Sequence, residues 1–180
     1  MVPRGTFYFV GVDREVRMND EEADSLIAKL KATIGKEVVF QAPDELGRAS
    51  FRQYALAIGD FNPLYSDRGL AQAHGLRDVM APPTLICDTW QFVDSDFDET
   101  GRQSALKDEL EMGGLRAGNS YEFFQPVHPD DIVSARRKTK NVYEKIGRSG
   151  RLLFCEIETS YSNQRNELLA TNVETMFLRL

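Results

Sequence analysis

The chain of 180 residues contains few of the residue types that build metal centres or disulfide frameworks. Its two cysteines are Cys87 and Cys155, and its two histidines are His74 and His128. Both cysteines lie in apolar runs, which predicts reduced core residues rather than a disulfide. The sequence has no Cys/His spacing of the kind that binds zinc. We therefore expect neither a metal site nor a bound cofactor.

Long apolar runs and an excess of positive charge are also lacking. No stretch approaches the roughly 18 consecutive apolar residues that a membrane span needs, and no signal peptide is visible. The net charge of −6 argues against general affinity for nucleic acid. The sequence thus predicts a cytoplasmic protein with no membrane or nucleic-acid partner. Its apolar fraction of 42% is typical of a globular domain.

The first half of the chain has the apolar spacing of helices. We expect helices over residues 19–35, 46–59 and 67–75, each ended by a glycine. A further helix is predicted from Pro82 to Val93, with the prolines in its first turn. Its apolar residues, Trp90 among them, cover most of the circumference, so we expect this helix to be buried. The acidic excursion over residues 94–113 is interpreted as a lid, an interface arm or a mobile loop.

The second half has the composition of β-strands. "EVVF" at 37–40 is short enough for an edge strand, and four longer runs follow at 118–127, 131–146, 151–163 and 167–180. Helices followed by strands indicate the α+β class, with an antiparallel sheet wrapped around the buried helix. We expect an N-terminal extension with a helix over residues 1–35 and one domain over residues 36–180.

The stretch "AIGDFNPLYSD", residues 57–67, is polar and turn-forming between two apolar patterns. In one interpretation it is only a helix-ending turn, in which Asp60 and Asn62 bond to their own backbone. In the other, Asp60 lies beside the start of the buried helix and acts as an acid or base. The helix start, near Pro83 and Thr84, would then offer partial positive charge to a developing oxyanion.

The segments "YALAIGDFNPLYSDRGLAQAHG" and "MAPPTL" resemble the MaoC-like (R)-specific enoyl-CoA hydratases and 3-hydroxyacyl thioester dehydratases, which have the hot-dog fold. "GNSYEFFQPVHPDDIV" and "ETSYSNQRNELLATNVET" look like the sheet of that family, so the resemblance covers roughly residues 36–180. It implies a substrate that is an acyl-CoA or acyl-carrier thioester, with coenzyme A present only as part of the substrate.

In that family an aspartate and a histidine five residues apart hold the water that adds to the enoyl double bond. The resemblance places Asp60 and Asn62 on the motif, but Tyr65 stands where the histidine is expected. Pro83 stands where the family carries a glycine whose N–H binds the thioester oxygen. A tyrosine, with an unperturbed pKa of ~10, is a poor base. A proline has no N–H, which leaves the Thr84 N–H as the donor.

These departures resemble the degenerate, N-terminal-type domains of the family and leave three hypotheses. The chain is an active hydratase that uses Asp60, Tyr65 and Asn62, or it is a non-catalytic or half-catalytic subunit of a hetero-oligomeric hydratase. The third hypothesis is a hot-dog thioesterase or a non-catalytic acyl-thioester-binding module. We also expect a homodimer, or a heterodimer with a catalytic hot-dog subunit, because a lone sheet leaves an edge uncovered.

Three further features have more than one interpretation. Arg136 and Lys138, in "ARRKTK", belong either to a solvated strand face or to a docking site for the phosphates of coenzyme A. His74 is interpreted as a helix C-terminal cap or surface residue rather than a base. His128, in the turn "PVHPDD", is predicted to be exposed to solvent.

Overall fold

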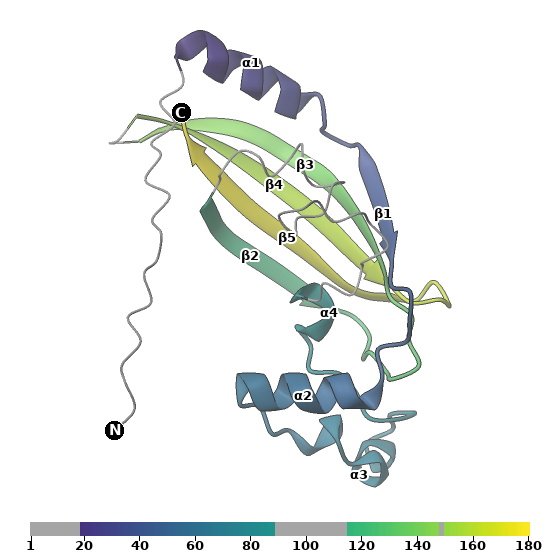
Figure 1. The fold of residues 1–180 in the computed structure, drawn as a ribbon. Coiled ribbons are helices and arrows are strands. Elements are labelled where there is room, and N and C mark those ends of the chain that lie inside the picture. Colours follow the sequence, from purple (N-terminus) through teal and green to yellow (C-terminus); the bar gives the residue numbers. More distant parts are fainter. Residues whose placement is uncertain (1–18, 89–114, 148–149) are drawn as a thin grey trace, which may run out of the picture.

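The computed structural model describes residues 19–88, 115–147 and 150–180, and it has the predicted α+β architecture (Figure 1). The helices precede the four long strands, and one short edge strand lies between the first two helices. The helical elements are α1 (Asp20–Lys31), α2 (Arg48–Ile58), the short 3₁₀ turn η1 (Pro63–Tyr65), α3 (Arg68–Ala73) and α4 (Leu85–Asp88). The strands are β1 (Glu37–Gln41), β2 (Leu115–Phe123), β3 (Ser134–Gly147), β4 (Gly150–Ser162) and β5 (Leu168–Arg179).

The five strands form one antiparallel sheet in the order β1-β3-β4-β5-β2. The predicted long strands are confirmed, and β1 is the short edge strand that the sequence indicated. At the opposite edge, β2 pairs only with β5 among the described strands. Both edges therefore carry backbone groups that could pair with another chain.

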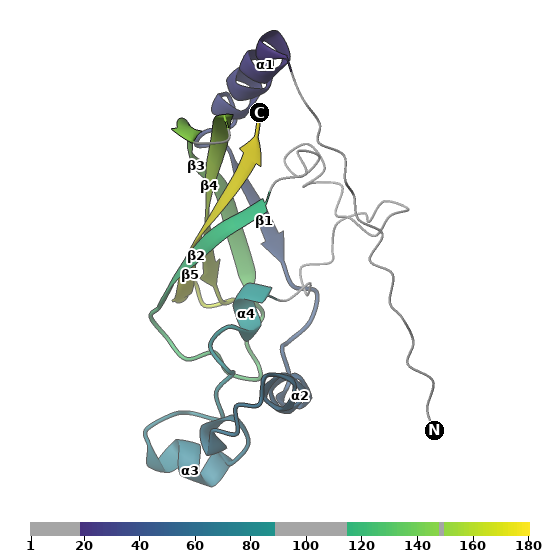
Figure 2. The ribbon, with the colours of Figure 1, turned by 90° about the vertical axis from the view of Figure 1, so that its left-hand side faces the viewer.

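Alternation along β4 shows which face of the sheet is covered. Leu153, Cys155, Ile157 and Tyr161 point to one side and are buried. The end of the strand that carries Leu153 packs in a cluster with Ile27 of α1. The other end, at Tyr161, joins a second cluster that contains residues of α2 and α4. Seen edge-on, the sheet lies between α1 at one end and α2 and α3 at the other (Figure 2).

Helix α1 begins with a capping box. The Asn19 side chain accepts a hydrogen bond from the Glu22 N–H, and the Glu22 carboxylate accepts one from the Asn19 N–H. Acidic residues fill the first turn and lysines the last, which matches the helix dipole. Ile27 and Leu30 are buried, so α1 is docked on the sheet rather than solvated. The predicted boundary at residue 35 stays a prediction.

Helix α2 buries Phe51 and Ala55, as the apolar spacing predicts. Gly59 ends it at φ 70°, a left-handed conformation that glycine adopts without strain. Ile58, which shares the apolar spacing of Phe51 and Ala55, is 50% exposed because it lies in the last turn of the helix. Helix α3 follows residue 67, where the sequence predicted a helix to begin, and Asp67 caps it by accepting from the Leu70 N–H.

The predicted buried helix is described only in part. Leu85 and Ile86 of α4 are buried in the cluster formed with α2 and the sheet. The remainder of the predicted helix to Val93, including Trp90, and the excursion over residues 94–113 lie outside the described residues. Among the helices that are described, none has the length and apolar character needed to cross a membrane.

Candidate active site

The loop after α2 satisfies much of its own polar chemistry. The Asp60 Oδ1 atom accepts a hydrogen bond from the Asn62 N–H at 3.2 Å. The Asn62 Oδ1 atom accepts one from the Leu64 N–H at 3.0 Å and so caps η1. These are the contacts of the turn interpretation, in which short polar side chains bond to the nearby backbone. The structure thus gives Asn62 a local role in shaping the loop.

Tyr65 lies against Asp60, where the family motif has a histidine. Its hydroxyl donates to the Asp60 Oδ2 atom at 3.0 Å, and its side chain is buried at 5% exposure. Burial, followed by the hydrogen bond to the Asp60 carboxylate, raises the pKa of Tyr65 above its usual value of 10.0. The phenol therefore stays protonated at neutral pH. It can donate a hydrogen bond or a proton, and it is a poorer base than an unperturbed tyrosine.

The start of α4 is joined to α2 through side chains. The Tyr54 hydroxyl lies 2.9 Å from the Thr84 Oγ1 atom, while Pro83 is exposed and has no N–H. The Met80 N–H donates to the Leu64 carbonyl at 3.0 Å and ties this segment to the loop. Asp60 lies six residues beyond Tyr54 in the chain. Tyr54 is a contact of the site that the sequence interpretation missed, since only its apolar spacing was visible.

Arg136 and Lys138 lie away from this loop, on strand β3. The Arg136 guanidinium pairs with Glu37 at 2.8 Å, and the Lys138 ammonium pairs with Glu158 at 2.8 Å. Both pairs cross between neighbouring strands, as expected of a solvated strand face. A role for these two residues in binding coenzyme A stays a prediction.

The two histidines have different surroundings. His74 caps α3, with its Nδ1 atom 2.9 Å from the Leu70 carbonyl, as predicted. The prediction that His128 is exposed is wrong, because its side chain is only 6% exposed. Its Nδ1 atom lies 2.9 Å from the Val79 carbonyl, so this nitrogen carries the proton and donates. The turn "PVHPDD" is therefore packed against the segment that leads into α4.

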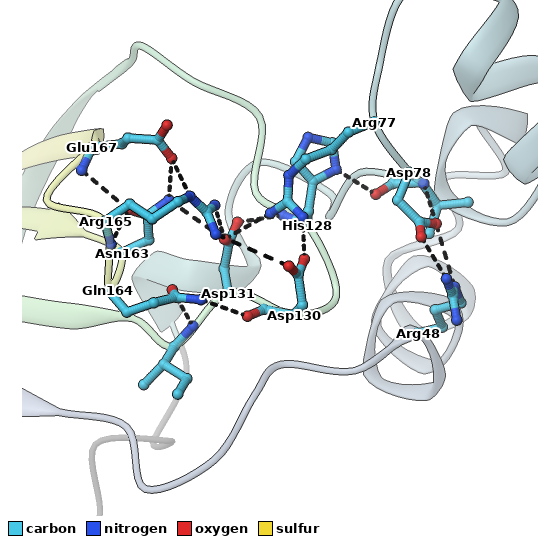
Figure 3. Close-up of polar contacts among 12 residues, drawn as sticks. Arg48, Arg77, Asp78, His128, Asp130, Asp131, Asn163, Gln164, Arg165 and Glu167 are labelled. Atoms are coloured by element: carbon cyan, nitrogen blue, oxygen red, sulfur yellow. Dashed lines mark hydrogen bonds and ion pairs between the residues drawn. The ribbon is translucent and has the colours of Figure 1, made fainter.

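A polar network around Asp131 fixes this packing (Figure 3). The Asp131 side chain is fully buried and accepts from the Arg77 guanidinium at 2.8 Å and from the Arg165 guanidinium at 2.5 Å. It also accepts from the His128 N–H at 2.7 Å. Asn163 of the β4–β5 turn donates to it at the longer distance of 3.4 Å. The carboxylate thus joins the loop after α3, the β2–β3 connection and the β4–β5 turn.

A second carboxylate, Asp78, joins α2 and α3 to the same region. It receives two hydrogen bonds from Arg48, at 3.3 and 2.5 Å, and Arg68 lies 3.7 Å away. The bonds from Arg48 hold the pKa of Asp78 below its usual value. Burial alone would raise the pKa of Asp130, but its ion pair with Arg77 brings that pKa below the usual range. The sequence offered no local signal for these pairs.

The chemistry available in the candidate site is limited. Within residues 19–88, 115–147 and 150–180, no cluster of three or more His, Cys, Asp or Glu side chains could hold a metal ion. The loop has two carboxylates: Asp67 caps α3, and both oxygens of Asp60 already accept hydrogen bonds. The arrangement can hold a polar group against a protonated phenol, but it lacks the imidazole of the motif.

Residues 32–172 match the family described as FAS1-like, dehydratase domain region. The chain belongs to this family. A probable enoyl-CoA hydratase subunit and MaoC-like dehydratases are among the similar proteins, so the resemblance to MaoC-like hydratases and dehydratases is confirmed at the level of the family. The match leaves all of helix α1 outside and includes the loop, the network around Asp131 and most of the sheet.

Curated relatives cover different shares of the chain. A UPF0336 protein of Parafrankia sp. is 43% identical over 141 residues, which is 78% of this chain and 79% of that protein. The match to the Streptomyces coelicolor UPF0336 protein, also 43% identical, covers 31% of this chain and only 37% of that protein. A probable enoyl-CoA hydratase alpha subunit of Thermomonospora curvata is 26% identical over 162 residues, 79% of this chain and 48% of that subunit.

Solved structures confirm the hot-dog fold. A chain of the ChsH1-ChsH2 complex from Mycobacterium tuberculosis is similar with a TM-score of 0.71 and 19% identity, covering 88% of this chain and 92% of that one. A chain of the HadBC (3R)-hydroxyacyl-ACP dehydratase complex from the same organism has a TM-score of 0.60 and 20% identity, and the match covers 78% of this chain and 95% of that one. The (R)-hydratase of A. caviae has a TM-score of 0.58 and 20% identity, and the match covers 82% of this chain and 96% of that one.

Proposed function

We propose that this chain is the non-catalytic subunit of a hetero-oligomeric hydratase or dehydratase that acts on enoyl or 3-hydroxyacyl thioesters. A partner hot-dog subunit supplies the aspartate and histidine that activate water. This chain contributes a folded surface against which the acyl thioester binds. The proposal refines the family assignment, which by itself leaves open whether the chain reacts.

The observation that carries the proposal is the hydrogen bond from Tyr65 to Asp60. Hydration needs a base that takes a proton from water, and an efficient base has a pKa near the working pH. The raised pKa of Tyr65 moves in the wrong direction for that role. Because Asp60 already receives the Tyr65 hydroxyl and the Asn62 N–H, a water would have to compete with both donors.

The start of α4 supports the same conclusion. Pro83 replaces the glycine of the family motif, so the N–H that would bind a thioester oxygen is missing at that position. The Thr84 side chain is engaged with Tyr54, on the neighbouring helix. Two chemical functions of the family site, the base and one oxyanion donor, are therefore lost together.

The edge strand β2 is the surface we propose for the partner. It is exposed along nearly its whole length, with Leu115 at 63% and Phe123 at 43% exposure. Among the described strands it has a neighbour on one side only, so its other edge can pair with a strand of a second subunit. The similar chains from ChsH1-ChsH2 and HadBC come from complexes of two different proteins, which supports this assembly.

The test is to purify the chain alone and together with a catalytic hot-dog subunit encoded beside it, and to follow the hydration of an enoyl thioester by absorbance. We expect turnover from the complex and none above background from the isolated chain. Turnover of several per second by the isolated chain would refute the proposal.

The variant Tyr65→His adds a matched test, because it restores the aspartate–histidine spacing within the same loop. We expect the isolated variant to remain inactive, since the backbone donor lost at Pro83 is still missing. Hydration by Tyr65→His alone would show that only the base was lost, and the chain would then be half-catalytic. Tyr65→Phe serves as the control that changes the same side chain without adding an imidazole.

A further inference from the structure

A cavity of about 420 Å³ lies at the N-terminal end of α2, away from Asp60 and Tyr65. Three arginines line it: Arg48 from α2, Arg68 from α3 and Arg77 from the following loop. Its volume is within the range of small-molecule sites, roughly 300–1,000 Å³. The proposed function assigns no role to this cavity.

Carboxylates hold two of these guanidinium groups in place. Arg48 makes two hydrogen bonds to Asp78, and Arg77 pairs with both Asp130 and the buried Asp131. An arginine has five N–H donors, so each of these side chains keeps donors for another group. Because their positions are already fixed, little side-chain entropy is lost when they bind a ligand.

Arg68 has more N–H donors available for an anion than Arg48 or Arg77. Among the residues that the structure describes, its ion pair is with Asp78 at 3.7 Å, which is longer than a hydrogen bond. Its side chain is 61% exposed. An anion in the cavity could therefore take the donors of Arg68 without breaking a hydrogen bond that the fold already has.

The backbone at the cavity also offers donors. Gly47 lines the cavity and is the N-cap of α2, and in the described part of the chain no side chain caps this helix. Its first turn contains no acidic residue. Glu45, Asp78 and Asp130 bring as many negative charges to the lining as the arginines bring positive ones. Recognition would thus depend on the directed donors rather than on bulk positive charge.

We propose that this cavity binds the phosphate of a phosphopantetheine arm, with Arg68 as the principal donor. That phosphate is common to coenzyme A and to acyl carrier proteins, and the inference rests on the proposed thioester substrate. Arg48 precedes Tyr54 by six residues, a rise of roughly 9 Å along α2. An extended pantetheine arm exceeds this distance, so a phosphate in the cavity that Arg48 lines does not confine the thioester to this end of α2, and the thioester stays free to meet the partner's catalytic residues.

Arg136 and Lys138 are the competing basic group for the same phosphate. Both are engaged with glutamates on the strand face, and neither lines the cavity. The two alternatives can be separated by substitution. Arg68→Gln and Arg136→Gln each remove one guanidinium, and Arg52→Gln removes an exposed arginine from α2, one turn beyond Arg48, as the matched control.

Isothermal titration of the purified full-length protein, in complex with its partner subunit, would compare 4′-phosphopantetheine with unphosphorylated pantetheine. We expect the phosphorylated probe to bind at least ~10-fold more tightly, since charge-assisted hydrogen bonds are strong. Arg68→Gln should remove about that advantage, whereas Arg52→Gln and Arg136→Gln should leave it within about twofold. Equal binding of the two probes, or a loss with Arg136→Gln and not with Arg68→Gln, would overturn the proposal.

Competition then identifies the carrier. We expect either coenzyme A or a holo carrier protein to displace the probe, and the competitor that does so is the source of the phosphate. In either case Arg68→Gln should weaken the binding of that competitor. Displacement by neither overturns the proposal. Because Arg68 makes no hydrogen bond to any residue that the structure describes, thermal unfolding of Arg68→Gln should match the wild type. The titration needs no turnover, so an inactive complex that still binds the probe refutes the proposed function alone.

Discussion

The loop around Asp60 and the junction around Asp131 hold their carboxylates in different ways. Asp60 receives its hydrogen bonds from Asn62 and Tyr65, residues no more than five positions away. Asp131 is fully buried and binds Arg77 and Arg165, which come from distant parts of the chain. The first aspartate shapes one loop, and the second joins three connections at one end of the sheet.

The proposed function makes the Asp60 loop a non-catalytic form of the family motif, whereas Asp131 has a structural role. The Asp60 loop keeps the motif's outline, yet its partners now satisfy the carboxylate locally. The Asp131 junction carries the long-range connections that place the loop and the start of α4 against the sheet. We therefore expect stability to depend on Asp131 far more than on Asp60.

The largest effect is expected for Asp131→Asn. The substitution removes the charge of the fully buried carboxylate, although Arg77 keeps its pair with Asp130 and Arg165 its pair with Glu167. Losing charged hydrogen bonds of this kind typically costs about 2 kcal/mol or more of unfolding free energy. Urea denaturation would measure it. Asp60→Asn is the matched control and should cost less than about 1 kcal/mol, since its contacts are local and partly exposed. Equal losses for the two variants would contradict the comparison.

Acid should weaken the junction next. The pKa of Asp78 lies below its usual value of 3.8 in the folded chain, and that of Asp130 is lowered too. A carboxyl group whose pKa is lower in the folded state stabilises the fold at pH values above its pKa in the unfolded state. This stability is lost as the pH falls through its pKa in the folded state. The melting temperature should therefore drop below about pH 4. In Asp78→Asn and Arg48→Gln this drop should be shallower, and an unchanged pH profile would contradict the assignment.

A smaller effect is expected for Tyr65→Phe. The ring still fills its buried site, and only the hydroxyl that donates to Asp60 is removed. The net loss of one such hydrogen bond is about 1 kcal/mol. Chemical denaturation would detect it, and a loss comparable with that of Asp131→Asn would show that the loop is a structural centre after all.

The smallest effect is expected for Asn62→Ala. Its side chain caps the three-residue turn η1 through the Leu64 N–H, and losing such a cap costs roughly 0.5–1 kcal/mol. Asn62→Asp keeps an acceptor oxygen and should lie close to the wild type. The pair of variants, compared by thermal unfolding, tests whether Asn62 acts only through this cap.

Local patterns in the sequence predicted most of the described fold. Asn19, Asp67 and Gly59 mark helix ends where the structure has them, because a cap depends on its immediate neighbours. The composition of residues 151–163 likewise predicted the strand β4. Exposure of His128 was predicted wrongly, because its burial depends on Val79, 49 positions away.

In the candidate site, contacts within the loop were predictable and contacts between distant segments were not. Asp60 and Tyr65 lie together, as their spacing in the motif implied, because only five positions separate them in the chain. The contact of Tyr54 with Thr84 and the three arginines of the cavity were not foreseen. They come from segments whose approach depends on the packing of α2, α3 and the β2–β3 connection.

The proposal that this chain is a non-catalytic subunit is tested most directly by the turnover of the purified complex carrying Asp60→Asn in this chain. We predict hydration of the enoyl thioester within about twofold of the wild-type complex, because the reacting aspartate belongs to the partner. Removing a catalytic base typically lowers turnover by 10²-fold or more. A loss of that size in the Asp60→Asn complex, with the complex intact by light scattering, would contradict the account.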